Sequence, residues 1–199
     1  MPATARKLPN LMTVAEFLTW PGDGTGRTYE LVDGEVRAQD PGSDAHGTVD
    51  ANLISFIHNH LKAHRPHCRV VSQGGIAPRL RANWNYRVPE LAVTCIPNRA
   101  DVHMTPEPLL LIEVLSPSNR RDTWSNVPLY ASVPSVMEIL LVESEEISAE
   151  LLRRRSDGSW PEDAESFGPG STIRLESIGL DLQMAEIYAG THLARTAER

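Results

Sequence analysis

Two glutamates of this 199-residue chain stand where a carboxylate is unexpected. Glu113 lies inside the apolar run LLLIEVL (109–115), and Glu90 follows Pro89 and opens the apolar run LAVTCI (91–96). Short apolar runs of this kind are typical of strands that are buried on both faces of a sheet. A buried carboxylate without a partner is costly or takes up a proton, so it needs a base, hydrogen-bond donors or a cation.

If the two strands lie side by side, Glu90 and Glu113 reach the same end of a sheet. Two carboxylates at one edge favour a divalent cation, because their charges repel each other until a cation neutralises them. The pattern alone leaves other interpretations open, since Glu113 could face solvent on an edge strand or pair with an arginine such as Arg87. Glu138, inside VMEILLV, is similar, and for it a structural role, on a solvent-facing edge or in an arginine pair, is favoured. For Glu30, in TYELVDGE, the pattern favours a solvated face of a hairpin.

The helices and strands expected around these carboxylates indicate an α/β domain with a mixed sheet. Helices are expected over 14–20, 46–64, 122–132 and, as a turn or helix, 179–188. Strands are expected over 28–32, 35–38, 69–72, 75–80, 91–96, 109–115, 136–143, 149–155 and 172–175. We expect one domain over 12–190, with tails at 1–11 and 191–199.

Composition is that of an ordinary globular protein, with 19 Lys and Arg against 26 Asp and Glu and a formal charge of −7. This balance argues against a generally basic nucleic-acid binder, although a local basic cleft is compatible with it. No run reaches the roughly 18 apolar residues of a membrane span, and the N-terminus lacks a signal-peptide core. Cys68 and Cys95 are too few for a disulfide framework, so we expect reduced thiols and a cytoplasmic protein.

Several short motifs follow one another in a distinctive order between about Met12 and about Gly190. They are MTVAEFLTW, YELVDGEV, a helix led by a histidine, RVPELAVTC, LIEVLSPSNRRD, Tyr130 and LLVE. In this order they resemble the large bacterial family of restriction-endonuclease-like proteins within the PD-(D/E)XK nuclease superfamily. The resemblance implies a restriction-endonuclease-like core, which is a central mixed β-sheet flanked by helices. It also implies a homodimer with a Mg²⁺- or Mn²⁺-dependent site that cuts DNA.

The resemblance assigns roles to carboxylates at matching positions. Glu90 occupies the position of the motif aspartate, and Glu113 occupies the acidic position of the next strand, so both would be metal ligands. Glu30, the glutamate of YEL, would lie near the same metal. Gln73 and Arg87 are neighbours that would contact the substrate phosphate.

Two departures from the family pattern concern catalysis. The family's lysine lies four residues after an aspartate on the following helix, which places Asn126 at the lysine position after Asp122. Glu90 in place of aspartate adds one methylene, and a displacement near 1 Å can cost about a hundredfold in rate. Arg120 or Arg121 could supply the missing cation. Two hypotheses follow: an attenuated metal-dependent endonuclease, or a catalytically inactive nuclease-fold protein that acts as a binding or assembly module.

Overall fold

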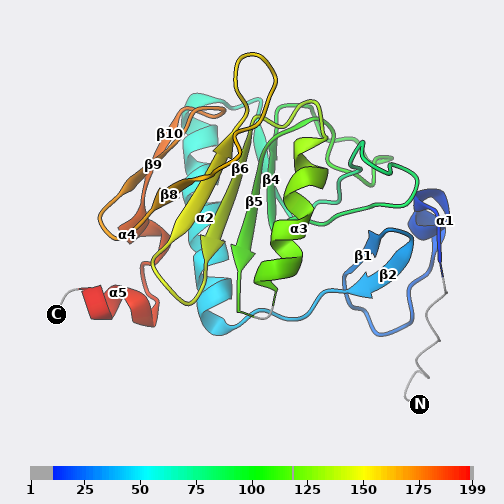
Figure 1. Cartoon of the computed structure of the whole chain (residues 1–199), viewed down its shortest axis with the longest axis horizontal. Helices are drawn as coiled ribbons and strands as arrows, with labels where there is room; N and C mark the ends of the chain where they lie inside the picture. The colour runs from blue at the N-terminus through cyan, green and yellow to red at the C-terminus, as the bar shows by residue number, and fades with distance from the viewer. Residues whose placement is uncertain (1–10, 118, 198–199) are drawn as a thin grey trace.

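The computed structural model describes residues 11–117 and 119–197. A six-stranded sheet in the order β3-β4-β5-β6-β7-β8 crosses this described part of the chain (Figure 1). Adjacent strands are antiparallel except for β5 and β6, which are parallel neighbours. In the sequence the helix α3 connects these two strands. The predicted mixed sheet flanked by helices is confirmed. The bounds are β3 (Arg69–Ser72), β4 (Leu91–Thr94), β5 (Pro108–Leu115), α3 (Arg120–Ala131), β6 (Glu138–Glu143), β7 (Ala149–Arg153) and β8 (Glu165–Phe167).

The sheet separates two apolar cores, because alternate side chains of a strand point to opposite faces. On β5, Ile112 packs in the core that includes α2 (Asp44–His64), and Leu111 and Leu115 pack in the core that includes α3. In Figure 1 α2 lies behind the sheet and α3 in front of it. Glu113 alternates with Ile112 and therefore points to the face that α3 covers.

A hairpin outside the main sheet has a small core of its own. The hairpin consists of β1 (Tyr29–Val32) and β2 (Glu35–Ala38), and it packs with α1 (Val14–Thr19). The Leu31 backbone pairs with the Tyr86 backbone through hydrogen bonds of 2.8 and 3.0 Å. This pairing fixes the hairpin beside the segment that leads into β4.

The last part of the described chain differs from the prediction. The turn or helix expected over 179–188 is wrong in its first half, because Leu180–Gln183 forms β10 and pairs with β9 (Thr172–Leu175) before α4 (Met184–Ile187) begins. The segment predicted as a C-terminal tail contains α5 (His192–Ala197), whereas residues 1–10 of the predicted N-terminal tail lie outside the described residues. None of the helices in the described part of the chain is long and apolar enough to cross a membrane.

The strand predicted over 75–80 is also wrong. Within that range, Ile76 makes a single bridge to Arg87, and no continuous ladder forms. Gly74, Gly75 and Pro78 interrupt the segment, and a Cβ at Gly75 would meet the Tyr86 side chain at under 3 Å. The backbone at this position must pass close to an aromatic ring, which a regular strand bearing side chains could not do.

The prediction of two reduced thiols is wrong, since Cys68 and Cys95 are joined by a disulfide. They flank β3 and β4, whose register pairs Arg69 with Thr94, so residues 27 apart in the sequence come face to face. This long-range register is not visible in the spacing of the cysteines. The prediction of a cytoplasmic location loses one of its arguments, because disulfides are rare in reducing compartments.

Candidate metal and phosphodiester site

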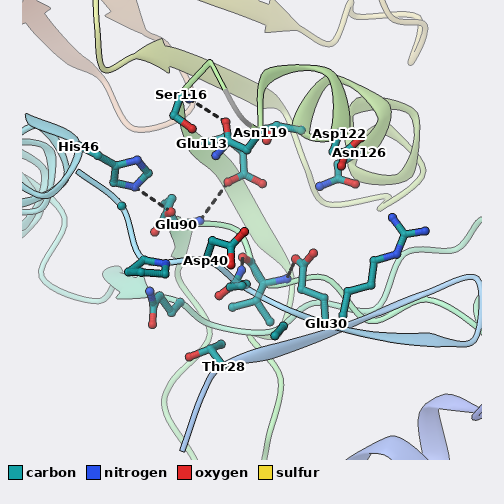
Figure 2. A pocket seen from close by; sticks show the side chains of 18 of the residues that line it. Thr28, Glu30, Asp40, His46, Glu90, Glu113, Ser116, Asn119, Asp122 and Asn126 are labelled. Atoms are coloured by element: carbon teal, nitrogen blue, oxygen red, sulfur yellow. Dashed lines mark hydrogen bonds and ion pairs between the residues drawn. The ribbon is translucent and has the colours of Figure 1, made fainter. Parts of the chain in front are cut away.

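A cavity of about 720 Å³ opens between the hairpin β1–β2, the first turns of α2 and α3, and the C-terminal end of β5 (Figure 2). The loops that follow strands at a sheet end are common positions for functional side chains, because the rigid strands hold them. All residues predicted for the site line this one cavity: Glu30, Gln73, Arg87, Glu90, Glu113 and Asn126. Segments far apart in the sequence therefore meet at this cavity.

The register of β4 and β5 brings the two central glutamates together. Leu91 pairs with Ile112, and one further step places Glu90 across from Glu113. The Glu90 backbone N–H donates to Glu113 Oε2 at 3.3 Å, and the Tyr130 hydroxyl donates to Glu113 Oε1. Glu113 does not face solvent on an edge strand, since β5 lies inside the sheet and Glu113 is 8% exposed.

The electrostatic surroundings of Glu113 favour its neutral form. Burial raises the pKa of Glu113 to about 8, the hydrogen bond from Tyr130 opposes this shift, and the charges of Glu30 and Glu90 add to it. A carboxyl group in this position is ionised at neutral pH only when a positive charge compensates it. A cation between these carboxylates would supply that charge.

The expectation that Glu30 lies on a solvated face of the hairpin is wrong, because its side chain faces the cavity. The Val88 backbone N–H donates to Glu30 Oε1 at 2.6 Å, and Arg87 Nη1 lies 3.7 Å from Glu30 Oε2. Burial raises the pKa of Glu30, and the Val88 hydrogen bond and the Arg87 charge oppose the rise. Arg87 thus pairs with Glu30, and it also donates to Asn85 Oδ1 at 3.2 Å.

Two cavity residues on α2 were missed in the sequence. His46 Nε2 lies 3.0 Å from Glu90 Oε1, and this hydrogen bond raises the pKa of His46. Asp50, one turn further along α2, also lines the cavity, and burial raises its pKa to about 6. The available signal was the i, i+4 spacing of the two polar residues on an otherwise amphipathic helix, which places them on one face.

The predicted substitutes for the lysine do not line the cavity. Arg120 Nη1 lies 3.0 Å from Glu143 Oε1, and the side chain of Arg121 is 98% exposed. Asn126 lines the cavity from α3, but its amide carries no charge. Among the described residues, the arginines that line the cavity are Arg27, Arg37 and Arg87.

The donor set fits a hard divalent cation such as Mg²⁺, which prefers carboxylate oxygens and water. Each carboxylate oxygen retains a lone pair after its hydrogen bond. Oxygens of Glu30, Glu90 and Glu113 do not all lie within 4.8 Å of one another. The Glu30 charge raises the pKa of Glu113 more than the Glu90 charge does, so all three carboxylates act on one another across the same cavity.

Comparisons with known proteins agree with this architecture. Residues 14–185 match the model of the Uma2 family, whose description is "Putative restriction endonuclease". The chain is 29% identical to the uncharacterized protein slr1290 of Synechocystis sp. over 177 residues. The matched segment covers 88% of this chain and 90% of that protein. The fold of the present chain is similar to that of the crystal structure described as "a putative nuclease belonging to DUF820" from Anabaena variabilis. The TM-score is 0.70 at 18% identity, over 89% of this chain and 98% of that chain.

The raised pKa of Glu113 predicts a pH dependence of stability in the metal-free protein. Glu113 binds its proton up to about pH 8 in the folded state, whereas an unfolded glutamate loses it near 4.5. The folded state thus holds more protons between these values, so stability falls as pH rises from about 5 to about 8. Thermal unfolding in EDTA should show this decline, and Glu113→Gln should reduce it. An equal decline in both proteins would contradict the assignment.

Proposed function

Because this chain belongs to the Uma2 family, we propose that it is a metal-dependent endonuclease that hydrolyses phosphodiester bonds in DNA. The observation that supports this most is the convergence of Glu90 and Glu113 on one cavity, with Glu30 on its wall. Mg²⁺ or Mn²⁺ held by Glu90 and Glu113 would lower the pKa of a bound water and offset charge on the phosphate.

The surrounding residues position the proposed ligands. His46 holds the Glu90 carboxylate from α2, and the Tyr130 hydroxyl holds Glu113 from α3. Glu30, whose Oε1 accepts from the Val88 backbone, is placed to orient a water or to act as a third ligand. Gln73 lines the same cavity and offers an uncharged amide to the phosphate oxygens.

The proposed activity is attenuated for two reasons. Asn126 presents an amide where a cationic side chain would face the phosphate, and losing one charge-stabilising donor typically costs about a hundredfold or more in rate. Glu90 extends one methylene further than an aspartate would. These departures support the alternative candidate, a catalytically inactive nuclease-fold protein that acts as a binding or assembly module.

Calorimetric titration with Mg²⁺ and Mn²⁺ tests the metal site. We expect the wild-type protein to bind the cation and Glu113→Ala to lose binding, because one of the two ligands is removed. Glu146→Ala is the matched control, since the Glu146 side chain is 62% exposed and does not line the cavity. Absence of binding in the wild-type protein would overturn metal dependence.

Restoring the family's residues tests the attenuation. We expect Asn126→Lys combined with Glu90→Asp to raise cleavage of plasmid DNA about a hundredfold or more, because the lysine supplies a cation at the phosphate. Asn126→Met in the same background is the control, since it provides similar length without charge. If the double variant cuts no nucleic acid, the hypothesis of an attenuated enzyme is wrong. The alternative, an inactive binding or assembly module, then remains.

A homodimer belongs to the same proposal, because cleavage of both strands of a duplex suits two sites related by two-fold symmetry. Light scattering of the purified protein should give twice the mass of the 22.0 kDa chain. The mass of a single chain would remove the dimer from the proposal without affecting the metal site.

A further inference from the structure

A phosphodiester in this cavity would lie next to Glu30, Glu90 and Glu113, whose negative charges repel it. A metal ion offsets part of this repulsion. Enzymes that transfer or hydrolyse phosphoryl groups also place a cationic side chain on the phosphate, where charge develops in the transition state. Of the residues that the structure describes, three arginines line the cavity and carry the charge that this requires: Arg27, Arg37 and Arg87.

Arg87 is poorly suited, because it is buried and two of its three guanidinium nitrogens already contact the protein, with Nε alone lacking a partner. Its side chain is 6% exposed, its Nη1 lies 3.7 Å from Glu30 Oε2, and its Nη2 donates to Asn85 at 3.2 Å. A guanidinium in these contacts maintains the position of Glu30 and would break them to reach a substrate. Arg87 therefore acts on the site through Glu30.

Arg27 lies outside the β1–β2 ladder that carries Glu30. It precedes β1 and pairs with Asp40 at 3.6 Å at the rim of the cavity. Its charge is not among those that act on the pKa of Glu30 or Glu113, and it acts on Tyr29 instead.

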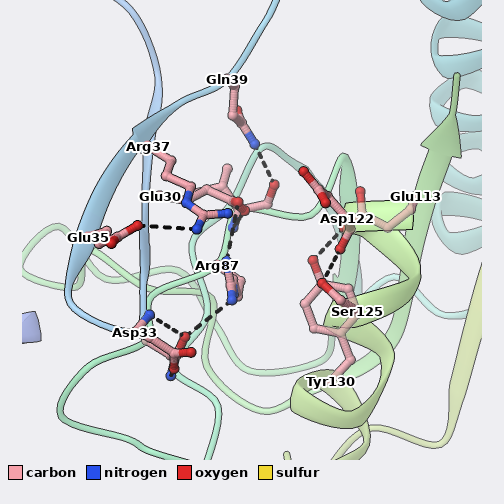
Figure 3. Close-up of polar contacts among 12 residues, drawn as sticks. Glu30, Asp33, Glu35, Arg37, Gln39, Arg87, Glu113, Asp122, Ser125 and Tyr130 are labelled. Atoms are coloured by element: carbon pink, nitrogen blue, oxygen red, sulfur yellow. Dashed lines mark hydrogen bonds and ion pairs between the residues drawn. The ribbon is translucent and has the colours of Figure 1, made fainter. Parts of the chain in front are cut away.

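Arg37 stands directly across the hairpin from Glu30. The register of β1 and β2 pairs these two residues, so their side chains lie on the same face of the hairpin. Figure 3 shows Arg37 next to Glu30, with its guanidinium linked to Glu35. Its charge is close enough to oppose the raised pKa of Glu30.

The present contacts of Arg37 leave it free to change partner. Its Nη2 lies 3.2 Å from Glu35 Oε2, and the two side chains are 54% and 59% exposed. Ion pairs this exposed contribute little, because water and salt screen them. A phosphate that enters the cavity therefore competes with a weak surface pair, and not with a buried one.

We propose that Arg37 is a phosphate-binding cation of this site: it contacts the nucleic-acid phosphate at which cleavage takes place from the hairpin, while the lysine position at Asn126 stays without a cation. This inference rests on the proposed function and adds a residue to it. An arginine stays protonated throughout the working pH range, so Arg37 acts as a hydrogen-bond donor and counter-charge, not as a proton carrier. Its planar fork can donate to two phosphate oxygens at once.

Duplex binding measured by fluorescence anisotropy tests this contact in the absence of cleavage. A short fluorescein-labelled DNA duplex is titrated with the full chain in Ca²⁺ at several salt concentrations. Loss of one phosphate contact in Arg37→Ala should reduce the slope of log affinity against log salt by about 0.9. Arg99→Ala is the matched control, since Arg99 is an exposed arginine that also pairs with a carboxylate two residues away and does not line the cavity, and it should keep the wild-type slope.

Cleavage and metal binding complete the experiment. In Mg²⁺ we expect Arg37→Ala to cleave DNA about a hundredfold more slowly than wild type, and Arg37→Lys to recover part of the loss. Calorimetry should show that Arg37→Ala still binds Mg²⁺, which demonstrates an intact fold and metal site.

The outcomes separate this inference from the proposed function. If the wild-type protein binds and cleaves DNA and Arg37→Ala has the same salt slope and rate, Arg37 is not the phosphate ligand and the nuclease function stands. A loss in Arg27→Ala without a loss in Arg37→Ala would also overturn the inference. If the wild-type protein neither binds nor cleaves the duplex, the nuclease function and the role of Arg37 fail together.

Discussion

The confinement of several carboxylates in one partly closed cavity is the constraint on which the arrangement of this region depends. Glu113 is buried beside Glu30 and Glu90, so each of them needs donors that limit the repulsion. The Tyr130 hydroxyl and the Glu90 and Val88 backbone N–H groups provide these donors. They come from α3 and from the segment that enters β4. The packing of the sheet and α3 therefore supplies the donors that allow these carboxylates to lie close together.

Those donors explain why the apolar cores matter for the site. The hydrogen bond to Glu113 requires that α3 be packed on its face of the sheet, and the core beneath α3, with Leu111 and Leu115, provides that packing. The bond from Val88 to Glu30 similarly requires the small core of the hairpin, which includes Leu31 and Val88 themselves. A substitution in either core would therefore change the positions of the carboxylates as well as the stability.

Local pattern was sufficient for the elements that carry the site, since short apolar runs and a tight turn each have a clear periodicity. It also brought Glu90 and Glu113 to one sheet end, because the strands expected over 91–96 and 109–115 are of similar length and leave few registers. Pattern alone did not separate Glu113 from Glu138, which both interrupt apolar strands. Glu138 is held by Arg153 at 2.9 Å and by the Ser177 backbone, as the structural interpretation expects.

Contacts between distant segments could not be predicted in this way. The link between His46 and Glu90 and the disulfide between Cys68 and Cys95 both depend on the three-dimensional register of segments that are far apart in the sequence. The prediction for residues 180–183 was wrong for a different reason: they pair with the nearby residues 172–175, and the apolar Leu180 and Leu182, which alternate as in a strand, were assigned to the helix that follows. The local pattern favoured a solvent-exposed position for the Glu30 side chain. Only the resemblance to the nuclease family predicted that Glu30 lies near the other carboxylates.

The division of the cavity between two separately packed units has an evolutionary consequence. Glu90 and Glu113 belong to the central sheet, whereas Glu30 and Arg37 belong to a hairpin that packs with α1 in its own core. Mutations that lengthen, shorten or recharge the hairpin leave the two large cores intact. Related chains can therefore diverge on the hairpin side of the cavity while they keep the same sheet and the carboxylates that it holds, and the hairpin is the part of the fold in which that diversification should accumulate.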